Sequence, residues 1–144
     1  MELRVDASEI SAYATRLGAA PGLIRSELST TVRAVAVEGV GLAQGYAPVD
    51  TGALRGGIAL LSSGGMEASY GVRGIVYARM REFGGTIVGR PWLVFRTKSG
   101  NWVKVRSVTQ TGSRYMQRSL DALRPRAEAA FGAALQRIVA RIGG

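Results

Sequence analysis

Two tryptophans and three cations alternate over a short stretch of the chain, and they form its strongest candidate binding surface. The stretch predicts two strands, about 91–97 and 101–108, joined by the turn Lys98-Ser99-Gly100-Asn101. Because side chains alternate between the two faces of a strand, one face is expected to carry Trp92, Val94, Arg96, Trp102, Lys104 and Arg106. Indole rings packed with cations favour an anionic partner, and the opposite face is expected to be buried.

The residue types that perform most enzyme chemistry are missing or scattered. The chain has no histidine and no cysteine, which removes the commonest general base and the thiolate nucleophile. The glycine-rich segment 52–57 lacks the Lys-Ser/Thr pair of a phosphate-binding loop. No acidic residues have the spacing of a divalent metal site, and Glu82 is expected to pair with Arg79 or Arg81 rather than to catalyse. We therefore expect no enzyme, no catalytic residue, no metal and no cofactor.

Positive charge is concentrated in one segment. The 144 residues contain 19 Lys+Arg and 10 Asp+Glu, a formal net charge of +9. Ten of the bases and a single acid, Glu82, fall within residues 73–118. Such a segment is typical of a surface that meets a polyanion or an acidic protein, and a simple solvated surface is the alternative.

The hydrophobic pattern predicts one α+β domain over residues 1–144. It indicates a short strand at Leu3–Val5, a helix over 7–17 that begins at an Asp6–Glu9 capping box, and a long helix over 21–46 with one apolar stripe. Strands at 58–61 and 66–73, a helical turn at 77–83 and the hairpin follow, before a C-terminal helical region at about 114–142 that Pro125 interrupts or restarts. The order favours a long helix and flanking helices packed on one face of an antiparallel sheet, with a protruding β-hairpin.

The N-terminus and the apolar runs bear on localisation. Met1–Asp6 lacks the basic-then-apolar layout of a secretory signal, and no apolar run reaches the ~20 residues needed to cross a bilayer. We expect a soluble, intracellular protein, or one packaged in a particle assembled inside a cell, with no membrane partner.

Two strings go beyond composition. The first is Ala47-Pro48-Val49-Asp50-Thr51-Gly52-Ala53-Leu54-Arg55-Gly56-Gly57-Ile58, and the second is Tyr77-Ala78-Arg79-Met80-Arg81-Glu82-Phe83-Gly84-Gly85. Together they resemble motifs of the tailed-phage head–tail joining, neck or tail-completion proteins, the gene-product-ten-like family of lambdoid siphophages. The string Arg114-Tyr115-Met116-Gln117-Arg118-Ser119-Leu120 resembles a diverged form of the element that opens the last helix in that family. The hairpin at 91–108 then resembles an insertion relative to the shortest members.

The resemblance implies a structural virion protein, located in the neck or at the head-proximal end of the tail and assembled in the host bacterial cytoplasm. It implies a closed ring, a hexamer, that contacts itself, adjoining adaptor or stopper proteins and the tail tube. DNA would pass through the ring without specific binding. A tail terminator that caps the tail tube is the alternative within this class.

Physical chemistry suggests roles for residues of the first string. Asp50 or Thr51 is expected to cap a short helix through its side-chain oxygen, and Gly52 permits a tight backbone behind it. Leu54 is expected to pack this turn on the long helix, while Arg55 projects outward toward a neighbouring subunit.

In the second string, Tyr77 and Phe83 bracket one helical turn beside Glu82, and Gly84 closes it. The two aromatic residues are interpreted as core, with an interface role as the alternative. From a different class, a nucleic-acid-binding module that uses the Trp/Arg/Lys face also fits the hairpin, although the first half of the chain is net acidic.

Overall fold

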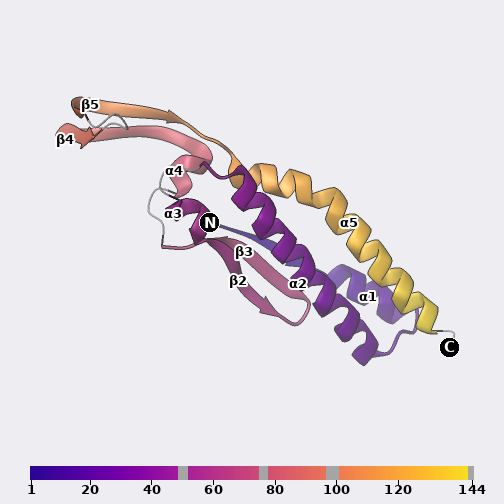
Figure 1. Cartoon of the computed structure of the whole chain (residues 1–144). Helices are drawn as coiled ribbons and strands as arrows, with labels where there is room; N and C mark the ends of the chain where they lie inside the picture. Colours follow the sequence, from indigo (N-terminus) through magenta and orange to yellow (C-terminus); the bar gives the residue numbers. More distant parts are fainter. Residues whose placement is uncertain (49–51, 75–77, 97–100, 143–144) are drawn as a thin grey trace.

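The computed structural model describes residues 1–48, 52–74, 78–96 and 101–142, with the backbone alone at 85–96, 103 and 105–111. It is an α+β fold, as the hydrophobic pattern predicts. Ten elements follow one another: β1 (Glu2–Asp6), α1 (Ser8–Arg16), α2 (Pro21–Tyr46), α3 (Ala53–Gly57), β2 (Ile58–Gly64), β3 (Glu67–Val72), α4 (Ala78–Phe83), β4 (Gly84–Arg96), β5 (Trp102–Thr111) and α5 (Tyr115–Ile142). Figure 1 shows α2 and α5 side by side, with the sheet of β1, β2 and β3 packed on α2.

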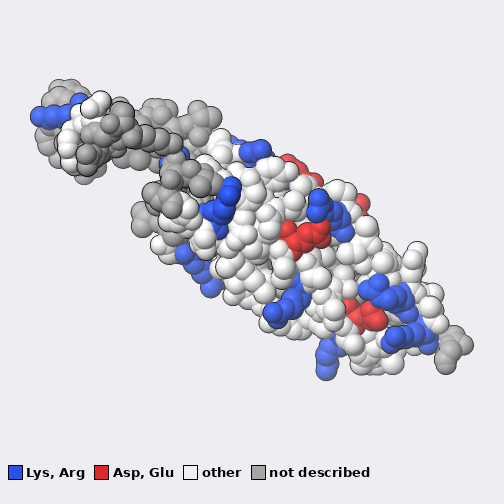
Figure 2. Space-filling view, viewed as in Figure 1, with Lys and Arg blue, Asp and Glu red and all other residues white. Residues whose placement is uncertain are grey.

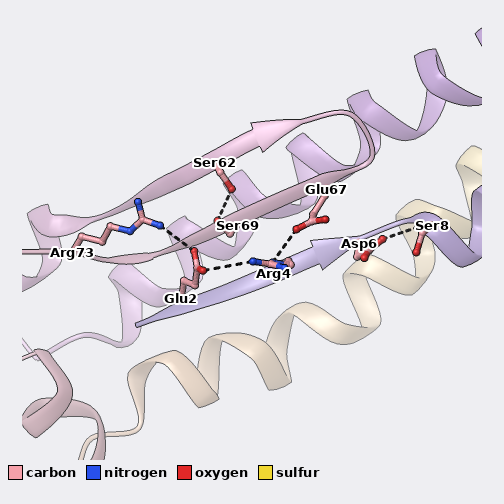
Figure 3. Close-up of polar contacts among 8 residues, drawn as sticks. All are labelled: Glu2, Arg4, Asp6, Ser8, Ser62, Glu67, Ser69 and Arg73. Atoms are coloured by element: carbon pink, nitrogen blue, oxygen red, sulfur yellow. Dashed lines mark hydrogen bonds and ion pairs between the residues drawn. The ribbon is translucent and has the colours of Figure 1, made fainter.

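The three-stranded sheet is antiparallel, in the order β1-β3-β2. The central strand β3 is buried from Ala68 to Val72, because it has a neighbour on each edge and α2 across one face. Ion pairs tie β1 to β3: the Arg4 guanidinium lies 3.0 Å from the Glu67 carboxylate, and that of Arg73 lies 3.5 Å from Glu2 (Figure 3). These pairs are exposed, so each adds at most about 1 kcal/mol of stability.

Helix α2 is the long helix that the apolar stripe predicts. Its buried face includes Ile24, Leu28, Val32 and Val35, and Pro21 occupies its first turn. Gly39 lies where the ring of Tyr70 crosses the helix, so closely that a Cβ atom at this position would overlap the ring. The small residue thus permits the close approach of β3 to α2, and the fully buried Tyr70 fills the space.

The C-terminal region forms one helix rather than two. Pro125 lies inside α5, so of the two alternatives, the start of a new helix and a position within one helix, the second is confirmed. Two arginines of α5 reach back to α2, where Arg126 bonds Glu38 at 2.7 Å and Arg137 bonds Glu27 at 2.9 Å. Packing of α5 along α2 therefore compensates for the helical hydrogen bond that proline cannot donate.

The predicted capping box of α1 is also wrong. The N-cap residue is Ala7, which has no side-chain cap, and Asp6 Oδ1 accepts a hydrogen bond from the backbone N–H of Ser8 at 2.8 Å. This bond holds the pKa of the Asp6 carboxyl below its usual value. Asp6 is paired in β1, one residue before the N-cap position, so it does not serve as the cap. At the other end of the helix, Gly18 has φ 91° and ends α1, as predicted.

Strands β4 and β5 pair antiparallel and extend beyond the helices in Figure 1. They are longer than the predicted 91–97 and 101–108. The register sets Leu93 opposite Val105 and Arg96 opposite Trp102. The connecting residues 97–100 lie outside the described part of the chain, so the hairpin turn stays a prediction.

The crossing of Tyr70 over Gly39 generates a stability test. Gly39→Ala should lower the free energy of unfolding by about 1–3 kcal/mol, because the added methyl must displace a buried ring. Gly41→Ala is the matched control, since a Cβ atom there meets open space and alanine favours helix by up to about 1 kcal/mol. Urea unfolding of both variants measures the difference. Equal stability of the two would show that the ring yields without cost.

Candidate functional site

The junction of α4 and α5 is organised by one buried carboxylate. Glu82, 2% exposed, accepts hydrogen bonds from the backbone N–H groups of Met116 at 2.7 Å and Gln117 at 3.1 Å. These are orphan donors in the first turn of α5, where the helix dipole also favours a negative charge. The expectation that Glu82 pairs with Arg79 or Arg81 is therefore wrong: its partners are main-chain amides brought close by the fold.

Further bonds fasten the same junction. The Tyr115 hydroxyl donates to the Ala78 carbonyl at 3.0 Å, and the backbone N–H of Arg114 donates to the Glu82 carbonyl at 3.0 Å. Burial, together with the Glu82 charge, raises the pKa of the Tyr115 phenol to about 12. Both ends of the helical turn 78–83 are thus bonded to the segment that opens α5.

Phe83 is 48% exposed, so its interpretation as a core residue is wrong. The guanidinium groups of Arg114 and Arg79 lie over its ring, 5.1 Å and 5.4 Å from the centroid. Arg114 has φ 55°, the one non-glycine residue of the described chain in the left-handed region. Gly84, at φ 75°, ends α4 behind Phe83, as predicted. The turn therefore presents a cation-covered aromatic ring at the surface.

A third arginine lies one turn further along α5. The Arg118 guanidinium is 4.5 Å from the centroid of the Tyr46 ring and donates a hydrogen bond to the Ser113 carbonyl at 3.4 Å. Among the described residues, none of the ion pairs involves Arg79, Arg114 or Arg118. Figure 2 shows blue surface where the strand pair joins the body, with red surface beside it, and further blue and red surface along the body.

The first string contributes packing and one exposed cation. Helix α3 begins after Gly52, which has φ 83° and is the N-cap residue. Leu54 is buried, and it shares a core cluster with residues of α2, while Arg55 is exposed; both outcomes match the predictions. Asp50 and Thr51 lie outside the described residues, and so does Tyr77, so their roles stay predictions.

The predicted Trp/Arg/Lys face is described in part. Trp102 is 70% exposed and Lys104 is exposed. Trp92, Arg96 and Arg106 belong to β4 and β5, but their side chains lie outside the described part of the chain. A shared surface of these five residues therefore stays a prediction.

The three motif strings meet in one hydrophobic cluster. Six of its eleven buried members come from the strings: Ala47, Leu54 and Ile58 from the first, Ala78 from the second, and Tyr115 and Met116 from the third. Segments far apart in the sequence thus form a single structural joint at the base of the strand pair. Sequence reasoning missed the arginines at 114 and 118, because only contacts across the fold reveal that they lie over aromatic rings.

No family model, curated protein or solved structure matches this chain. Within the described residues, no group of three or more His, Cys, Asp or Glu side chains is placed to hold a metal ion. The described helices include none that is long and apolar enough to span a bilayer.

Loss of the Glu82 charge should weaken the joint. Glu82→Gln places an amide donor where the carboxylate accepted bonds from two N–H groups, so we expect the free energy of unfolding to fall by about 1–3 kcal/mol. Glu128→Gln, at an exposed position of α5, should change it by less than about 0.5 kcal/mol. Thermal unfolding measures the stability of both variants. Equal stability of the two would contradict a structural role for Glu82.

The Tyr115 phenol predicts a dependence of stability on alkaline pH. An unfolded tyrosine ionises near pH 10, whereas the folded protein keeps Tyr115 neutral to about 12. Between these values the unfolded chain binds fewer protons, so the free energy of unfolding falls as pH rises. Tyr115→Phe should reduce this fall, while the lost bond to Ala78 costs about 1 kcal/mol at neutral pH.

Tyr13→Phe is the control for that measurement, since Tyr13 is 47% exposed and should leave the alkaline slope as in the parent. Urea unfolding at several pH values gives the slopes. An unchanged slope in Tyr115→Phe would mean that other groups cause the alkaline loss of stability.

Proposed function

We propose that this chain is a structural protein of a tailed phage or prophage, a head–tail connector component that assembles as a ring and joins the tail to the head. The proposal rests on three sequence strings that resemble motifs of the neck and tail-completion family and occur in the same order. Such a protein acts by assembly, and its activity lies in its surfaces rather than in a catalytic site.

The observation that supports the proposal best is the convergence of the three strings. They supply six of the buried residues of one core cluster, and Glu82 of the second string caps the helix that the third string opens. Strings that recur together as family motifs are expected to share one structural task. Here that task is to fasten the strand pair β4–β5 to a rigid body of α2, α5 and the sheet.

The strand pair is the element that we expect to reach a neighbour. It extends beyond the helices in Figure 1, and Trp102 is 70% exposed on it. Exposed tryptophan together with arginine is typical of protein interfaces, where a few such residues carry most of the binding energy. The partner is the next subunit or an adjoining component of the neck or tail.

Charge reversal on the strand pair tests the proposal. Arg96→Glu with Lys104→Glu should leave the subunit folded but yield separate heads and tails in electron micrographs of phage particles. The reason is that reversed charges at an interface introduce like-charge repulsion and unpaired charges. Circular dichroism of the purified variant checks that it folds.

The matched control reverses two exposed arginines of α2, Arg25→Glu with Arg33→Glu, and should support normal joining. Normal joining by the strand-pair variant would count against the proposal. The nucleic-acid module would be favoured instead if the strand-pair variant joined heads and tails normally and the wild-type protein bound a defined nucleic acid with sub-micromolar affinity at physiological salt.

A further inference from the structure

The arginine–phenylalanine patch, which we define as Arg79, Phe83, Arg114 and Arg118, carries an electrostatic conflict. Arg114 and Arg118 lie at the start of α5, where the helix dipole is positive and disfavours cations. The carboxylate of Glu82, in the same helical turn as Phe83, is buried and bonded to main-chain amides. Within the described part of the chain, the three arginines enter none of the ion pairs. Among the described residues, the patch therefore gathers three cations, none of which is held in an ion pair.

The backbone adds a second cost at the same place. Arg114 has φ 55°, a conformation that residues with a Cβ atom adopt at an energetic cost and that glycine adopts freely. A strained residue persists where the surrounding structure holds it. Here the hydrogen bond from the Arg114 N–H to the Glu82 carbonyl holds the backbone, and the side chain lies over Phe83.

We propose that the arginine–phenylalanine patch docks an acidic segment of a different protein, one that presents carboxylates next to an apolar side chain. Guanidinium groups bind carboxylates through paired, charge-assisted hydrogen bonds. The exposed half of the Phe83 ring supplies apolar area for the neighbouring side chain to bury. This inference concerns a surface separate from the strand pair and does not depend on the head–tail joining role.

A nucleic acid fits the patch less well than an acidic protein segment. Single strands gain affinity by stacking bases on open aromatic faces. Two guanidinium groups lie over the Phe83 ring and one over the Tyr46 ring. A base would have to displace these cations to stack, whereas contacts with phosphates alone would leave Phe83 exposed.

A second copy of this chain also fits less well, because half of its acidic residues are already engaged or buried. Within the described residues, four of the ten acidic residues of the chain form ion pairs with its arginines: Glu2, Glu27, Glu38 and Glu67. A fifth, Glu82, is buried. A chain with a net charge of +9 therefore offers little negative surface to its own copies. The complementary charge must come from another protein.

Fluorescence anisotropy with the full chain tests the proposal. The probe is a fluorescein-labelled peptide of alternating glutamate and leucine, compared with a labelled oligothymidylate at the same physiological salt. We expect the wild type to bind the peptide more tightly than the oligothymidylate. Arg79→Gln with Arg114→Gly should weaken peptide binding by about tenfold or more, since two charge-assisted contacts are lost. Glycine suits the backbone at position 114, so this variant should fold.

Arg124→Gln with Arg141→Gln removes the same charge from exposed positions farther along α5 and should bind the peptide as the wild type does. Phe83→Ser should also weaken binding of the peptide. If binding were purely electrostatic, this substitution would leave it unchanged, because it removes no charge. Should Arg114→Gly fail to fold by circular dichroism, Arg79→Gln with Arg118→Gln replaces it with the same expected loss.

Three results would overturn the proposal. An equal loss in the control variant would indicate diffuse attraction by net charge. Tighter binding of the oligothymidylate, lost in the patch variant, would assign the patch to nucleic acid. Self-association of the wild type in sedimentation, abolished by the patch variant, would assign it to a second copy.

Discussion

The carboxylate of Glu82 lies at the start of α5, where it accepts bonds from the backbone N–H groups of Met116, which is buried, and of Gln117. A buried anion is stable only where donors replace its hydration, and a helix N-terminus provides both donors and a favourable dipole. The strand β4 begins two residues after Glu82, and β5 ends shortly before α5. Both ends of the strand pair therefore leave from this one joint, so its direction relative to the body depends on the cap.

The distribution of ion pairs decides where the positive charge of the chain acts. Along the body, arginines of β1 and α5 meet glutamates of the sheet and of α2, so these charges largely cancel locally. At the α4–α5 joint the Glu82 carboxylate is buried, and Arg79, Arg114 and Arg118 lie over aromatic rings. These arginines therefore add positive charge to the surface beside the strand pair.

Local pattern was sufficient to predict most of the elements. Apolar spacing along residues 21–46 marks α2, and Gly18 and Gly84 end helices because their backbones adopt positive φ. Predictions failed where a non-local contact competes with local preference. Asp6 bonds Ser8 instead of capping α1 because the pairing of β1 with β3 holds it in a strand. At Pro125 the local pattern left two alternatives open, and in the structure the proline lies inside α5, which packs along α2.

The sequence by itself determined the fold class, the absence of histidine and cysteine, the segment that holds the excess positive charge, and the strings that form the joint. Only the tertiary structure decided what those residues do there. Glu82 and Met116 are 34 residues apart, and no periodicity relates a side chain to an amide at that distance. The exposure of Phe83 and the stacking of Arg114 on it follow from how α4 meets α5, since a contact between distant segments depends on packing that short-range spacing does not encode.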